Sequence, residues 1–129
     1  METEWVLPED LTAASAARGH VTDALTEVGV TDDALDDAVL VASELAANAA
    51  RHGRPPFILS IQLLDRQVRI TVGDHGDSGG PVLADADGAV DTDSGHGRGL
   101  ALVTALSRAI GWSRSGARLD VWADLDLNR

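Results

Sequence analysis

Two adjacent segments rich in β-branched residues constrain the fold most strongly. The sequences FILSIQLLD and QVRITVGD lie within residues 57–74 and are joined at Asp65 and Arg66. Strands with so short a connection pair as an antiparallel hairpin. Near the end of the chain, GWSRSGARLDVWADLDL predicts two further strands that turn at Ser115 and Gly116.

Helical patterns fill most of the remaining chain. An alanine-rich segment after a short strand at 4–7 predicts a helix between Pro8 and Gly29. Thr31 is suited to cap a second helix that runs to about Gly53. The apolar spacing of GLALVTALSRAIG predicts a third helix over 97–110. Helices and antiparallel strands that are segregated along the chain predict an α+β fold, a two-layer sandwich with a mostly antiparallel sheet.

Composition limits what such a domain can do. The length of 129 residues and the hydrophobic content of 44% fit one compact domain, 1–129. The formal net charge of −11 repels nucleic-acid phosphates and anionic membranes, so we expect neither as a partner. The chain has no cysteine and no lysine, which excludes thiolate chemistry and the lysine-dependent ATP sites of P-loop proteins and protein kinases. Without a membrane-length apolar run or a secretory signal, we expect a cytoplasmic protein.

The second predicted helix carries three polar residues on one narrow face. Glu44, Asn48 and Arg51 follow the i, i+4, i+7 spacing within a largely apolar segment. An asparagine oxygen is a hard ligand suited to Mg²⁺, and a carboxylate one turn away can orient or deprotonate a nucleophile. The alternative is a solvated polar stripe, since charged helix residues usually face water.

The hairpin ends in a carboxylate. In VGDHGD, Asp74 closes a strand and Gly76 follows where the chain must turn. In a pocket, Asp74 could accept a hydrogen bond from an adenine amino group, while Gly76 lets the backbone approach the base. The alternative is an ordinary turn aspartate beside a turn glycine.

Alternating glycines precede the third predicted helix. In SGHGRGLALV, Gly95, Gly97 and Gly99 leave backbone N–H groups free to approach an anion at the helix N-terminus. Their spacing differs from the dinucleotide fingerprint, and the alternative is a merely flexible loop. Residues 76–96, rich in Gly, Asp and Ser, predict a mobile lid over a ligand.

Taken in order, SELAANAARHG, VGDHG and SGHGRGLALV resemble the asparagine box and the two glycine boxes of the GHKL ATPase superfamily. The chain looks closest to the anti-sigma-factor serine/threonine kinase branch. The resemblance implies the two-layer sandwich of histidine kinase-like ATPases, with helices on one face of the sheet. It also implies ATP and Mg²⁺ as cofactors, and an anti-sigma factor antagonist and a sigma factor as partners. Whether the chain forms a homodimer stays open.

The roles that the resemblance implies can be assigned by position. They are Glu44 as catalytic base, Asn48 as Mg²⁺ ligand, Arg51 near the phosphates, Asp74 as the adenine-recognition group, Gly76 in the base pocket, Gly95, Gly97 and Gly99 as hinge and phosphate wall of the lid, and Arg98 as a contact to the phosphate tail.

Two features leave alternatives open. Asp77 and Ser78 stand where many relatives have x-Gly, so a nucleotide-gated binding module with little or no kinase activity remains an alternative to a kinase. The string GDSGGP at 76–81 also matches the nucleophile segment of chymotrypsin-like proteases. A triad is defined by geometry, however, and this short, partly helical chain has Ser15 where that family has its histidine.

Overall fold

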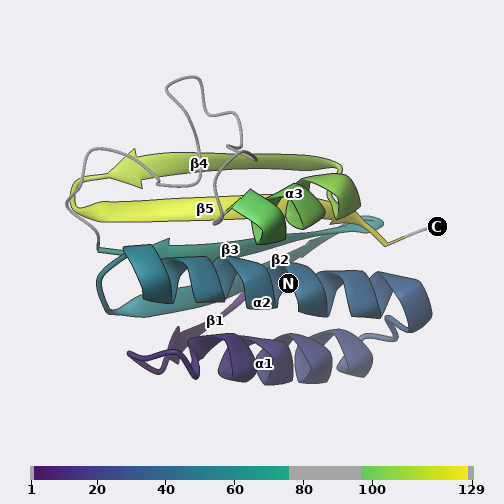
Figure 1. Cartoon of the computed structure of the whole chain (residues 1–129). Helices are drawn as coiled ribbons and strands as arrows, with labels where there is room; N and C mark the ends of the chain where they lie inside the picture. The colour runs from purple at the N-terminus through teal and green to yellow at the C-terminus, as the bar shows by residue number, and fades with distance from the viewer. Residues whose placement is uncertain (1, 76–96, 128–129) are drawn as a thin grey trace.

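The computed structural model describes residues 2–75 and 97–127, with side chains throughout except at 97–100 (Figure 1). Its elements, in chain order, are β1 (Glu2–Leu7), α1 (Ala13–Glu27), α2 (Asp32–His52), β2 (Phe57–Leu64), β3 (Gln67–Asp74), α3 (Gly97–Leu106), β4 (Ala109–Ser115) and β5 (Arg118–Asp126). None of the helices in these ranges is long and apolar enough to cross a membrane.

The strands form one antiparallel sheet in the order β1-β2-β3-β5-β4. The predicted hairpin is confirmed, and Arg66 at its turn adopts a φ of 61°. In the register, Ile61 lies opposite Ile70, and Ile70 lies opposite Ala123 on β5. These buried residues form one apolar face across the middle of the sheet.

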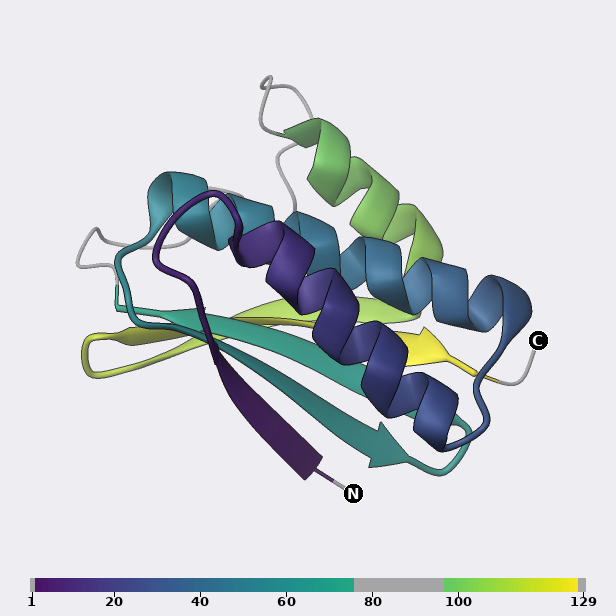
Figure 2. The ribbon, with the colours of Figure 1, turned by 90° about the horizontal axis from the view of Figure 1, so that it is seen from below.

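All three described helices cover that apolar face (Figure 2). The strands alternate as a half-buried sheet should: Leu59 and Ile61 are fully buried towards the helices, whereas Ser60 between them is half-buried on the other face. Buried alanines, including Ala17 on α1 and Ala42 on α2, are the small residues of the helical layer. The two-layer α+β prediction is therefore confirmed.

The long helix α2 begins and ends where the sequence predicts. Thr31 is its N-cap residue, but the Thr31 hydroxyl makes no hydrogen bond to the backbone of the first turn. It donates to Oδ2 of Asp32 at 3.2 Å instead. At the other end, the N–H of Gly53 donates to the carbonyl of Ala49 at 2.7 Å and closes the last turn.

Three predicted boundaries are wrong. The opening strand begins at Glu2 and not at residue 4. The third helix ends at Leu106, not at Ile110, because Ile110 joins β4 opposite Ala123. Leu106 and Ile110 both pack against the core, so a helix followed by a strand satisfies the same apolar spacing as one longer helix. The last hairpin turns one residue later than predicted, since Ser115 still pairs with Arg118.

Candidate functional site

The ends of α2 and β3 meet at one end of the molecule. A Cβ atom added to Gly53 would lie 2.8 Å from Oδ1 of Asp74, and closer still to the other two carboxyl atoms. The backbone of Gly53 is therefore packed directly against the Asp74 carboxyl group. One residue further along each segment, the N–H of His75 donates to the carbonyl of Arg54 at 2.9 Å.

Asp74 is a buried residue and not an exposed turn aspartate. The residue is 6% exposed, and strand alternation places it on the same helix-covered face as buried Val72. A buried carboxylate requires polar partners to offset the loss of hydration. The burial of Asp74 thus differs from that of an exposed turn aspartate, and the recognition role stays a prediction.

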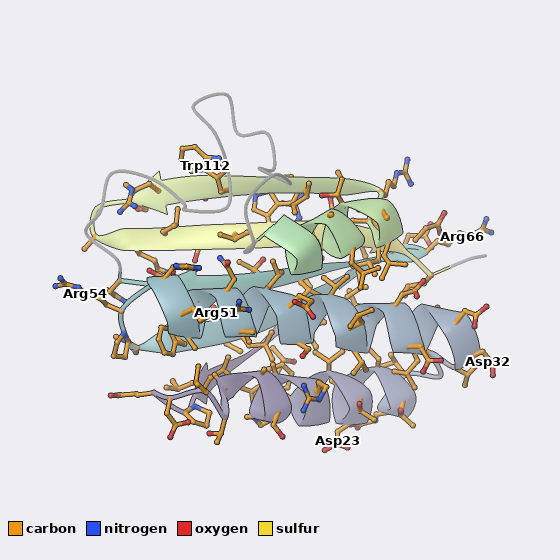
Figure 3. All side chains as sticks on the ribbon, in the orientation of Figure 1. Asp23, Asp32, Arg51, Arg54, Arg66 and Trp112 are labelled. Atoms are coloured by element: carbon orange, nitrogen blue, oxygen red, sulfur yellow. The ribbon has the colours of Figure 1, made fainter. Side chains whose placement is uncertain are left out.

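The three polar residues of α2 differ in their exposure. Asn48 is buried, with 9% of its surface exposed, Glu44 is half-buried and Arg51 is exposed. The Nε of Arg51 donates to the carbonyl of Ala47 at 3.4 Å. Figure 3 shows Arg51 near the end of α2 and Arg54 just beyond it. The solvated-stripe alternative is therefore wrong for Asn48, though it describes Arg51.

These groups follow one another along the axis of α2. At 1.5 Å per helical residue, Asn48 lies about 7.5 Å from Gly53 along the axis, and Glu44 about 6 Å beyond Asn48. Because Asp74 packs on Gly53, the order along the helix is carboxyl, amide, carboxylate. That order suits an elongated ligand lying beside the C-terminal half of α2.

Three residues that support this region had no such role predicted from the sequence. The Nη1 of Arg18 on α1 donates to Oγ of Ser43 at 2.8 Å, and Ser43 is 8% exposed. This bond ties α1 to α2 one residue before Glu44. The signal in the sequence was a serine inside an apolar helix. Gly53 was predicted only as a helix stop, because its contact with Asp74 depends on how β3 lies beside α2.

The third helix begins within the glycine turn. α3 starts at Gly97, so Gly97 and Gly99 lie in its first turn, and α3 lies beside α2 on the same face of the sheet (Figures 1 and 2). First-turn N–H groups have no partner within their own helix and can bind an anion. Arg98 follows Gly97 in the chain, but its side chain is not described. Gly76, Gly95 and the predicted lid lie outside the described residues.

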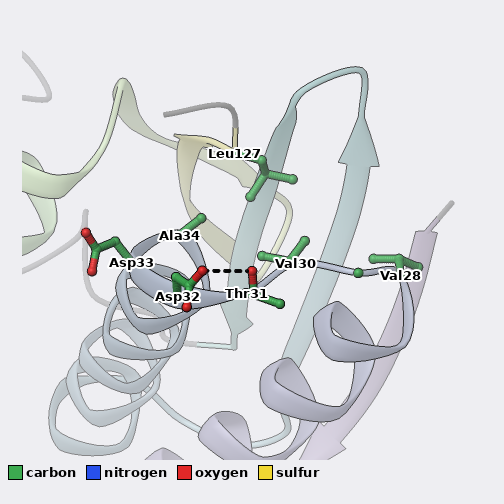
Figure 4. A pocket seen from close by; sticks show the side chains of 8 residues that line it. Val28, Val30, Thr31, Asp32, Asp33, Ala34 and Leu127 are labelled. Carbon is green, nitrogen blue, oxygen red and sulfur yellow. Dashed lines mark hydrogen bonds between the residues drawn. The ribbon is translucent and has the colours of Figure 1, made fainter.

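A cavity of about 370 Å³ lies at the opposite end of α2 (Figure 4). Its lining includes Thr31, Asp32 and Asp33 from the start of the helix, and Leu127 directly after β5. The two aspartates oppose the binding of a phosphate at this helix N-terminus. The nucleotide prediction therefore concerns the other end of α2.

A five-stranded antiparallel sheet with helices on one face, and polar groups where α2 and β3 end, defines the architecture of the histidine kinase-like ATPases. The model of the histidine kinase-like ATPase domain family matches residues 7–124. The chain belongs to this family, which confirms the predicted resemblance. Membership implies ATP as the ligand.

Solved structures share the fold. The RsbU and RsbW domains of Rv1364c from Mycobacterium tuberculosis align with a TM-score of 0.73 at 21% identity, covering 100% of this chain and 33% of that one. The Acinetobacter baumannii histidine kinase AdeS aligns with a TM-score of 0.57 at 15% identity, covering 98% and 68%. The histidine kinase domain of the blue-light activated kinase EL346 from Erythrobacter litoralis aligns at 0.54 and 21%, covering 88% and 61%.

The chain thus spans about a third of the Mycobacterium tuberculosis structure. A comparison with curated protein sequences gives no significant match. At these identities, the structural matches establish the fold.

Proposed function

We propose that this chain is an anti-sigma-factor serine/threonine kinase, which uses Mg-ATP to phosphorylate an anti-sigma factor antagonist and otherwise sequesters a sigma factor. One observation carries the proposal. The buried Asp74 carboxyl packs on Gly53 at the end of α2, and Asn48 and Glu44 follow it along the axis of that helix. The similarity of the whole chain to a structure that includes an RsbW domain supports this branch of the family.

In this proposal, Asp74 recognises the base. Its carboxylate accepts a hydrogen bond from the adenine amino group, and the backbone of Gly53 holds the carboxyl in place. Gly76 shapes the rest of the base pocket. A carboxylate that accepts from an amino group favours adenine over a base that presents a carbonyl oxygen there, because two acceptors would face each other.

Asn48 holds the metal. Mg²⁺ typically takes one or two protein ligands and completes its shell with substrate phosphates and water, so the Asn48 amide oxygen is a fitting single ligand. When bound, Mg²⁺ neutralises charge on the phosphates during transfer. In the described part of the chain, no group of three or more His, Cys, Asp or Glu residues is placed to hold a metal ion. We propose that the ion enters with the nucleotide.

Glu44 acts as the base in phosphoryl transfer. The serine hydroxyl oxygen of the antagonist attacks the γ-phosphorus, its proton passes to the Glu44 carboxylate, and ADP departs with the electrons of the broken P–O bond. The hydrogen bond from Arg18 to Ser43 fixes the helix next to Glu44.

The remaining predicted residues surround the phosphates. Arg51, exposed near the end of α2, lies near the phosphate tail in this proposal, and Arg98 contacts it from α3. Gly95, Gly97 and Gly99 form the hinge and phosphate wall of the lid, where N–H groups at the start of α3 face the anion.

The test separates binding from transfer. ATP affinity is measured by calorimetry with Mg²⁺, and transfer by radiolabelled ATP with purified candidate antagonists. Glu44→Gln should bind ATP with an affinity close to that of the wild type and lose transfer by about 100-fold or more. Asn48→Ala should lose Mg-ATP binding while its circular dichroism is unchanged. Asp36→Asn, an exposed change on the same helix, is the matched control.

Two results would overturn the assignment. Transfer by Glu44→Gln at the wild-type rate would remove Glu44 from the base role, and absence of ATP binding in the wild type would remove the nucleotide site. Binding of ATP without transfer to any antagonist would instead support the alternative of a nucleotide-gated binding module, which the departures at Asp77 and Ser78 favour.

A further inference from the structure

A second cavity, of about 380 Å³, lies between β1 and the C-terminal half of α1. Figure 2 shows the two elements side by side at the edge of the sheet. β1 is an edge strand of the described sheet, so one side of its backbone is available to another strand. We call this cavity the edge groove; its lining residues are Thr3, Trp5, His20, Asp23, Ala24, Glu27 and Val28.

The edge groove combines an aromatic wall with carboxylates. The rings of Trp5 and His20 are stacked, with centroids 4.9 Å apart and planes 13° apart. His20, Asp23 and Glu27 follow the i, i+3, i+7 spacing, so they share one face of α1. Asp23 and Glu27 are exposed, and Figure 3 shows Asp23 on the side of α1 away from α2.

On the outer face of the sheet, a tryptophan and a carboxylate of the same chain are both in contact with an arginine. There, the Arg69 guanidinium lies over the Trp122 ring at 4.1 Å from its centroid. The same guanidinium donates from Nε and Nη2 to the two carboxyl oxygens of Asp124, at 2.7 and 2.9 Å. One arginine thus makes a cation–π contact with a tryptophan and two hydrogen bonds with a carboxylate. The edge groove presents the tryptophan and the carboxylates, but none of its lining residues is arginine or lysine.

We propose that the edge groove docks an extended, arginine-bearing segment of a partner protein. The segment adds a strand along β1, and one of its guanidinium groups stacks on Trp5 and pairs with Asp23 or Glu27. The net charge of −11 attracts such a segment from a distance. Because β1 takes part through its backbone, an extended peptide fits this surface better than a free organic cation.

The edge groove is separate from the proposed ATP site. α1 and α2 run in opposite directions, so the C-terminal half of α1 lies towards the start of α2, away from Gly53 and Asp74 (Figure 1). The inference therefore does not rest on the proposed kinase function, and docking should persist with or without Mg-ATP.

The probe is the acetylated, amidated hexapeptide Val-Arg-Val-Arg-Val-Arg, titrated into the ¹⁵N-labelled full chain. NMR shifts should concentrate on the Trp5 indole N–H, the amides of β1 and residues 20–28. The peptide with lysine in place of arginine should bind several-fold more weakly, since an ammonium group cannot stack or pair bidentately. The double variant Asp23→Asn/Glu27→Gln should weaken binding by about tenfold.

The matched control is Asp33→Asn/Asp36→Asn, which removes the same charge from exposed positions at the start of α2. It should change the affinity by less than about twofold. An equal loss in both double variants would overturn the proposal in favour of general attraction to an acidic protein. Shifts confined to other surfaces, or none at millimolar peptide, would also overturn it. The proposal would also be overturned if the NMR shifts of β1 changed with protein concentration in the absence of peptide. That result would assign the groove to a second copy of the chain.

Discussion

Asp74 and Asp124 are both buried, on the neighbouring strands β3 and β5, with 6% and 7% of their surfaces exposed. They lie on opposite faces of the sheet and have different neighbours. Asp124, on the outer face, receives two hydrogen bonds from the Arg69 guanidinium. Asp74, on the helix-covered face, is packed against the backbone of Gly53.

The difference teaches that burial alone does not define the role of a carboxylate. At Asp124 an arginine from the same chain compensates the charge and occupies an acceptor position on each oxygen, which suits a structural ion pair. At Asp74 a glycine sets how closely α2 approaches the carboxyl, which suits recognition of a ligand at the junction of two elements. An arginine pairs with the carboxylate at one site, and the backbone of a glycine packs against the carboxyl at the other.

The largest expected effect is a difference in ATP affinity between variants of the two carboxylates. Asp74→Asn should weaken ATP binding by about 10- to 100-fold, because a hydrogen bond to a charged group contributes about 1.5–3 kcal/mol. Asp124→Asn should leave ATP affinity within about twofold of the wild type, because Asp124 lies on the opposite face of the sheet. Calorimetry with Mg-ATP measures both. Equal losses in the two variants would break the comparison.

A smaller effect sharpens the role of the glycine. Gly53→Ala should weaken ATP binding by about tenfold, because the new Cβ lies too close to the Asp74 carboxyl and must displace it. The backbone at Gly53 has a φ of −100°, which alanine adopts without strain. A fluorescent ATP analogue provides the binding measurement, and circular dichroism shows whether the fold is retained.

Gly73→Ala is the matched control, one residue before Asp74 on the other face of β3. Its Cβ meets the side chains of Asp120 and Arg118, whose ion pair is partly exposed and can move into solvent. We expect ATP affinity within about twofold of the wild type. If Gly73→Ala reduced ATP binding as much as Gly53→Ala, general disruption of β3 would explain both results.

The third effect concerns stability. Asp124→Asn should lower the free energy of unfolding by about 1–2 kcal/mol, discounted because the Arg69 side chain is 37% exposed, and Tm by about 4–8 °C. The hydrogen bond to Asp124 raises the pKa of Arg69. A raised pKa contributes stability below the ordinary pKa of arginine and loses it only above the raised value. The difference between variant and wild type should therefore stay constant from about pH 6 to 9 in thermal scans.

Much of this comparison could be predicted from the sequence. Asp74 ends a β-branched strand, and Asn48 interrupts an apolar helix, so both stood out from their local pattern. Local patterns also predicted the hairpin and the α2 boundaries, because a two-residue connection and the ends of a helix are determined by nearby residues.

The contacts that distinguish the two carboxylates could not be predicted in this way. Arg69 and Asp124 are 55 residues apart, and only the pairing of β3 with β5 brings them together. The contact of Gly53 with Asp74 likewise depends on how α2 lies on the sheet. The predicted end of α3 was wrong for a related reason, because pairing with β5 places Ile110 in a strand.

The smallest expected effect concerns an exposed carboxylate, to which we assign neither the ion-pair role of Asp124 nor the recognition role proposed for Asp74. Asp10 accepts hydrogen bonds from the hydroxyl and the backbone N–H of Thr12, just before α1, and these lower its pKa. A lowered pKa contributes stability above the ordinary pKa of aspartate and loses it as pH falls through the lowered value. Asp10→Ala should therefore lower Tm at pH 7 by about 2 °C or less, and the gap should close below about pH 4. Thermal scans from pH 7 to 3 measure it, and a gap that widens in acid would contradict the assignment.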